Sequence, residues 1–147
     1  MLEKHDSYPG IHLHDCDFTI RLEDNVLIFD FENGFWTQTP EGQYRLVAGQ
    51  IHISDFSLED LEIRVVKESR LFKRRAIVRR LSLAALAPLF RERFLQVVNE
   101  YYSQKELVWE CVVHPFCGKL RRKFGDWVII RVFSEAPRKY VYEENEQ

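Results

Sequence analysis

Residues 17–36 read DFTIRLEDNVLIFDFENGFW, and this stretch decides the fold class of the chain. Apolar side chains occupy every second position in 18–22 and again in 27–31, which is the period of a half-buried strand. Between the two runs stand Asp24 and Asn25, residue types that tolerate the positive φ of a two-residue hairpin turn. The stretch therefore predicts a β-hairpin.

The position of the turn also fixes the register of this hairpin. The apolar pairs then share one face, whereas a slip of one residue would scatter them over both faces. An isolated hairpin is marginally stable in water, so the rest of the chain must cover its apolar face. The predicted opposing pairs are Glu23 with Val26, Leu22 with Leu27, Ile20 with Phe29, Phe18 with Phe31, Thr19 with Asp30 and Arg21 with Ile28.

Length and composition indicate one folded domain. The chain has 147 residues, of which 46% are hydrophobic and 14% aromatic, so it can bury a substantial core. The share of aromatic and β-branched residues favours strands. We expect a single domain over residues 1–147, with flexible tails at 1–9 and 143–147.

Further strands and turns follow from the same alternation. No alternation of strands with long helices is evident, so the pattern favours a mainly β fold, either an antiparallel sandwich or an open barrel. Residues 116–126 are predicted as a basic loop, and 127–133 with 139–142 as a closing hairpin. The other predicted strands are residues 11–14, 44–54, 61–65, 76–81 and 107–113.

One short helix is predicted near residues 83–91, with Ser82 as its N-cap. The segment that follows has two interpretations. Its aromatic and β-branched residues favour a strand, whereas its apolar spacing also fits a helix running from 83 to 102, which would make the fold α+β. Pro88 would cost about 3 kcal/mol inside that longer helix, so we favour the short helix and a strand.

The run DCDF, then LIFDF with ENGFW, then RRLSLAAL followed by VVNEYY, resembles a group of small cytosolic proteins of Gram-positive bacteria that have no assigned function. The resemblance covers most of the chain. It implies β structure with a short helix at Ser82, and it carries over no catalytic residue.

The densest set of metal-ligating residue types is His12-Leu13-His14-Asp15-Cys16. In a regular strand, His12, His14 and Cys16 would share one face and could hold zinc with a fourth ligand such as His52 or His5. However, the apolar positions change from odd to even near 15–17, which predicts a bulge or a break. We therefore expect no cofactor, with this zinc site as the alternative.

A second group, Cys111, His114 and Cys117, lacks the spacing of a complete metal site. Basic clusters form another candidate site, because arginines beside aromatic rings can bind phosphate and stack on bases. Alternatively, these arginines protect exposed strand edges. The predicted patch for anions or nucleic acid consists of Arg74, Arg75, Arg79, Arg80, Arg121 and Arg122, with Arg70, Lys73, Lys119 and Lys123 nearby.

The sequence contains no familiar catalytic motif, so an enzyme is disfavoured but not excluded. The net charge of −2 disfavours a dedicated nucleic-acid binder. Three cysteines and a polar N-terminus predict a cytoplasmic protein, and no apolar run is long enough for a membrane span. We expect a non-catalytic interaction module that binds another protein or its own copy. Metal-dependent function and single-strand nucleic-acid binding are the alternatives.

Overall fold

The structure, a computed structural model, describes residues 2–5, 10–69, 71, 74–103 and 105–143. These residues form a mainly β fold, as predicted. One antiparallel sheet has the strand order β1-β11-β5-β4-β3-β8-β9-β10-β6-β7, and the short β2 pairs with β4. The strands are β1 (Leu2–His5), β2 (Ile11–His12), β3 (Asp17–Glu23), β4 (Val26–Gln38), β5 (Tyr44–Ile53), β6 (Leu61–Glu68), β7 (Arg75–Leu81), β8 (Phe94–Tyr102), β9 (Glu106–His114), β10 (Trp127–Phe133) and β11 (Lys139–Tyr142).

Helical segments are short and connect strands. None of the described helices is long and apolar enough to cross a membrane. They are the α-helices α1 (Leu83–Leu86) and α2 (Arg121–Phe124), and the 3-10 helices η1 (Leu58–Asp60), η2 (Ala87–Arg91) and η3 (Gly118–Leu120).

The predicted hairpin register is confirmed along β3 and β4. From Thr19–Asp30 to Glu23–Val26, every predicted pair is present, and Asp24 and Asn25 have φ values of 48° and 59°. Two details differ. Phe18 pairs with Leu95 of β8 rather than with Phe31, although the two phenylalanine rings remain 5.4 Å apart. Leu22 is buried less than predicted, and it lies next to the turn of the hairpin.

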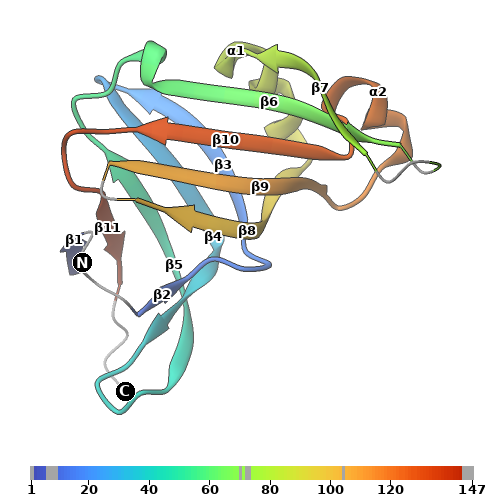
Figure 1. Cartoon of the computed structure of the whole chain (residues 1–147). Coiled ribbons are helices and arrows are strands. Elements are labelled where there is room, and N and C mark those ends of the chain that lie inside the picture. The colour runs from blue at the N-terminus through green and yellow to red at the C-terminus, as the bar shows by residue number, and fades with distance from the viewer. Residues whose placement is uncertain (1, 6–9, 70, 72–73, 104, 144–147) are drawn as a thin grey trace.

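The sheet bends at β3, because this strand pairs with β4 over residues 19–23 and with β8 through Asp17 and Phe18. Figure 1 shows that β6, β10, β9 and β8 cross in front of β3, β4 and β5. The Trp109 ring of β9 lies 4.7 Å from the ring of Phe29, which joins the two halves. The strand order ends on β1 and β7 without joining them, so in the described residues the sheet folds over but does not close.

The ambiguous segment after Ser82 is a short helix followed by a strand, as favoured. Ser82 is the N-cap of α1, and its hydroxyl accepts a hydrogen bond from the Ala85 amide at 3.1 Å. Pro88 lies within the first turn of η2, where its missing N–H costs little. The alternative of one helix over 83–102 is wrong, because residues 94–102 are β8 and pair with β9.

Three other predictions are wrong. The closing hairpin does not form, because β10 pairs with β6 and β9 whereas β11 pairs with β5 and β1. Part of the N-terminal tail is a strand, since Leu2–His5 adds to the edge of β11. The basic loop contains η3 and α2, whose turns place Phe124 in the core.

Candidate functional site

The His12–Cys16 segment does not bring its metal-ligand types together. A turn with Asp15 at φ 61° lies between Leu13 and Cys16, and the Cys16 amide donates to the Leu13 carbonyl at 2.9 Å. This turn carries Leu13 and Cys16 into the core and leaves His12 and His14 exposed. It is the predicted break in the alternation, and it separates the cysteine from the two histidines.

Each of these side chains has another environment. His12 lies 3.0 Å from the Tyr44 hydroxyl, and His14 contacts the Val98 carbonyl at 2.6 Å. Burial raises the pKa of the Cys16 thiol to about 11, against the effect of a backbone hydrogen bond that lowers it. A protonated thiol is a poor metal ligand. Among the described residues, no three His, Cys, Asp or Glu side chains form a group that could hold a metal ion.

The remaining candidate ligands are also apart. His52 contacts the Gln50 side chain at 2.8 Å, and the side chain of His5 lies outside the described part of the chain. Cys111 is fully buried, and burial raises the pKa of its thiol. His114 contacts the Asp17 carboxylate at 3.0 Å. Cys111 is thus engaged in packing, and His114 is engaged in a side-chain contact with Asp17.

The inner face of β8 carries polar side chains that sequence reasoning missed. A bulge between Val97 and Asn99 shifts the alternation of this strand. Glu100 therefore stands opposite the buried Trp109, on the inner face, and Tyr102 follows on the same side. No local sequence signal marks this bulge, because its position depends on the pairing of β8 with β9.

Glu100 holds an internal hydrogen-bond network. Its carboxylate accepts from the Leu13 amide at 3.1 Å and from the Tyr102 hydroxyl at 2.6 Å. The Trp109 indole donates to that hydroxyl at 3.2 Å, and the Arg138 guanidinium stacks over the Tyr102 ring at 4.8 Å. Part of the ring stays exposed, but burial of the hydroxyl and the charge of Glu100 raise the pKa of Tyr102. This cluster connects β8, β9 and the turn before β3.

The raised pKa of Tyr102 predicts a loss of stability at alkaline pH. Above about pH 10, the usual pKa of tyrosine, the unfolded state releases the Tyr102 proton while the folded state retains it. The folded state then binds more protons, so the free energy of unfolding falls as pH rises. In urea unfolding at a series of alkaline pH values, Tyr102→Phe is expected to lose less stability than the wild type. Tyr101→Phe, which changes an exposed neighbour, is the control; equal alkaline losses in all three proteins would contradict this assignment.

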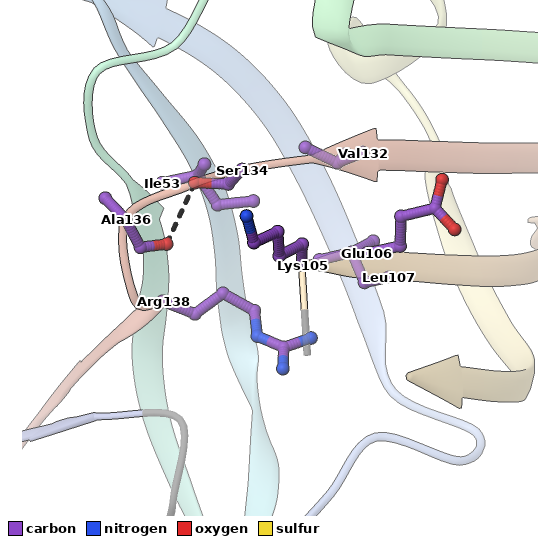
Figure 2. Close-up of a pocket in the computed structure, with 8 residues that line it drawn as sticks. All are labelled: Ile53, Lys105, Glu106, Leu107, Val132, Ser134, Ala136 and Arg138. Atoms are coloured by element: carbon purple, nitrogen blue, oxygen red, sulfur yellow. Dashed lines mark hydrogen bonds between the residues drawn. The ribbon is translucent and has the colours of Figure 1, made fainter. Parts of the chain in front are cut away.

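A small pocket lies beside this network. Figure 2 shows Lys105 and Arg138 among the residues that line it, and the Ser134 hydroxyl donates to the Ala136 carbonyl at 2.9 Å. Its volume of about 10 Å³ holds roughly one water molecule. The pocket is therefore too small for a substrate.

The two predicted arginine clusters meet at one end of the sheet. The Arg79 guanidinium on β7 donates to the Lys123 carbonyl of α2. Arg75 stacks over the Trp127 ring at 4.8 Å, at the start of β10. Figure 1 shows α2 beside the end of β7 that carries the β6–β7 turn. Arg70 and Lys73, also in the predicted cluster, lie outside the described residues.

Some arginines of these clusters are neutralised by carboxylates. Arg80, for example, lies 3.0 Å from Glu62. Glu62 also forms an ion pair with Arg64, the residue of β6 that stands opposite Arg80. These arginines stabilise the sheet and leave little charge for a ligand. The neutralised arginines and their partners are Arg75 with Glu68 and Glu110, Arg80 with Glu62, and Arg121 with Asp126.

Other cations at this end have no carboxylate partner among the residues that the structure describes, and all of them are exposed. We call this group the basic corner. Phe116, whose side chain is 85% exposed, precedes η3 at its margin. Sequence reasoning located these cations but could not separate them from the paired arginines. The basic corner consists of Arg74, Arg79, Lys119, Arg122 and Lys123.

Comparison with known proteins adds no relative. No protein-family model, curated protein or solved structure matches the chain.

Proposed function

We propose that this protein is a small cytoplasmic binding protein without catalysis, and that the basic corner is its surface for an acidic protein partner. The observation that carries this proposal is the set of five exposed, unneutralised cations at one end of a chain whose net charge is −2. Neighbouring like charges repel each other, and such a surface attracts an anionic partner and accelerates its association.

The remaining polar groups support a binding role rather than catalysis. The inward carboxylate of Glu100 is occupied by the Leu13 amide and the Tyr102 hydroxyl, so it serves the fold. All three cysteines are free, which fits a reducing compartment such as the cytoplasm.

Affinity capture from a lysate of the native host tests the proposal. Immobilised wild type is expected to retain an acidic protein that Arg122→Glu no longer retains. Lys105→Glu is the matched control, because it makes the same change in net charge at a distant exposed ion pair with Glu135. Its captured proteins should equal those of the wild type. If Arg122→Glu retains the same proteins, or if the wild type retains none, the basic corner is not the binding surface.

A second candidate function is single-strand nucleic-acid binding by the same corner. The exposed ring of Phe116 favours it, because an unstacked base can stack on such a ring beside phosphate-binding cations. Titration with a fluorescent oligonucleotide should then show affinity that falls steeply as salt rises. Affinity that does not change with salt would exclude this candidate.

A further inference from the structure

A groove lies at the other end of the molecule, between the β3–β4 turn and the loop that leads into η1. It has a volume of about 620 Å³, and its mixed lining includes the apolar side chains of Leu22, Phe56 and Leu58. The Phe56 amide donates to the Asn25 carbonyl at 3.2 Å, which ties the two walls together. Leu58 is 61% exposed, so the apolar lining is open to a partner.

The groove has an acidic margin. None of its carboxylates is in an ion pair within the described part of the chain, in contrast to Glu62, Glu68 and Glu110 along the sheet. This margin is therefore the electrostatic counterpart of the basic corner. It consists of Asp24, Asp55, Glu59 and Asp60.

Strand β6 separates the two surfaces. It begins directly after Asp60 of η1. At its other end, the amide of its last residue, Glu68, donates a hydrogen bond to the Asp126 carboxylate at 2.7 Å, next to α2. A strand of this length, Leu61–Glu68, spans roughly 26 Å. Figure 1 shows η1 and α2 at opposite ends of the sheet. The nearly balanced net charge thus conceals two oppositely charged ends.

We infer that the basic corner of one copy docks on the acidic groove of a second copy, with Phe116 against Leu22 and Leu58. This inference rests on the proposed function and names the acidic partner as the protein itself. The exposed Phe116 ring supplies an apolar group that can pack on the exposed Leu22 and Leu58 of the groove, and the cations near it in sequence meet the carboxylates of the margin. The opposite charges of the two surfaces favour this docking orientation, and like charges disfavour the contact of two basic corners or of two acidic grooves.

Docking of unlike ends makes the contact heterologous. Each bound copy leaves its other end free, so association continues into chains or closes into a ring. The expected behaviour of the wild type is therefore an average mass that rises with protein concentration and falls with ionic strength.

Sedimentation velocity with charge-reversed variants tests this inference. The corner variant carries Lys119→Glu and Arg122→Glu, and the groove variant carries Glu59→Lys and Asp60→Lys. All four residues lack a positive φ and a side-chain ion pair in the described structure, so melting temperatures close to that of the wild type are expected. Each variant alone should associate roughly tenfold or more weakly than the wild type. Mixed together, they should form a complex of one copy of each, because one basic corner and one acidic groove remain intact.

The outcomes separate this inference from the proposed function. A mixture that stays monomeric, or variants that each associate like the wild type, overturns self-docking. If the corner variant alone loses a captured partner while the wild type sediments as a monomer at every concentration, the corner binds another molecule: self-docking is then wrong and the proposed function stands. If captured partners and sedimentation are unchanged in both variants, both proposals fall.

Discussion

Trp109→Ala is expected to cost about 3–5 kcal/mol of the free energy of unfolding, as is typical of a large aromatic removed from a core. Trp109 is fully buried, and its ring lies within 4.7–6.2 Å of the rings of Phe18, Phe29 and Phe31. These contacts join the two halves of the folded sheet. A domain of this size is commonly stable by only about 5–15 kcal/mol, so this one substitution removes a large share. Urea unfolding followed by circular dichroism measures the effect.

Trp36→Ala provides the matched control. Trp36 stands on β4 opposite Leu46 of β5, and its side chain is 41% exposed. Its replacement should cost clearly less than that of Trp109, because less apolar surface returns to water. Equal losses for the two tryptophans would mean that Trp109 does not join the two halves of the sheet.

The second large effect is expected for Gly125→Ala, at the junction of α2 and β10. Gly125 has a φ of +64°, and a Cβ atom there would lie 2.5 Å from the Val66 carbonyl oxygen and 2.6 Å from the Val65 side chain. With ψ at −160°, this backbone conformation is adopted almost only by glycine and costs another residue roughly 1–3 kcal/mol, and overpacking typically costs about 1–3 kcal/mol more. Because this contact holds α2 against β6, the variant should also weaken binding by the basic corner.

Gly118→Ala is the control for this prediction, since it lies on η3 next to Lys119 and a Cβ there meets nothing within 4 Å. Its free energy of unfolding should stay within about 0.5 kcal/mol of the wild type. Thermal unfolding compares both variants with the wild type. If Gly125→Ala is as stable as Gly118→Ala, Gly125 does not pack closely against Val65 and Val66 of β6, and this part of the account is wrong.

Features set by neighbouring residues could be predicted from the sequence. The β3–β4 register follows from local alternation and from Asp24-Asn25, and the Ser82 cap follows from adjacent residues. Pairing between distant segments could not be predicted. Residues 127–133 and 139–142 are near in sequence but belong to different halves of the sheet, because the first segment pairs with β6 and β9 and the second with β5 and β1.

The same distinction applies to the candidate sites. The change of alternation before Asp17 correctly predicted the break that separates Cys16 from His12 and His14. The basic residues were visible in the sequence, but the neutralisation of Arg75 and Arg80 depends on the β6–β7 register, and that of Arg121 depends on the turn after α2 that brings Asp126 to it. Arg80 reaches Glu62 only because β7 lies beside β6, so sequence alone could not distinguish it from Arg79.

Acetylation of surface lysines, with and without the bound partner, tests most directly whether the basic corner is the binding surface. Lys119 and Lys123 belong to the corner, whereas Lys105 pairs with Glu135 away from it. Mass spectrometry should show that binding slows the labelling of Lys119 and Lys123 and leaves that of Lys105 unchanged. Equal labelling of Lys119 and Lys123 in the free and bound protein would contradict the account.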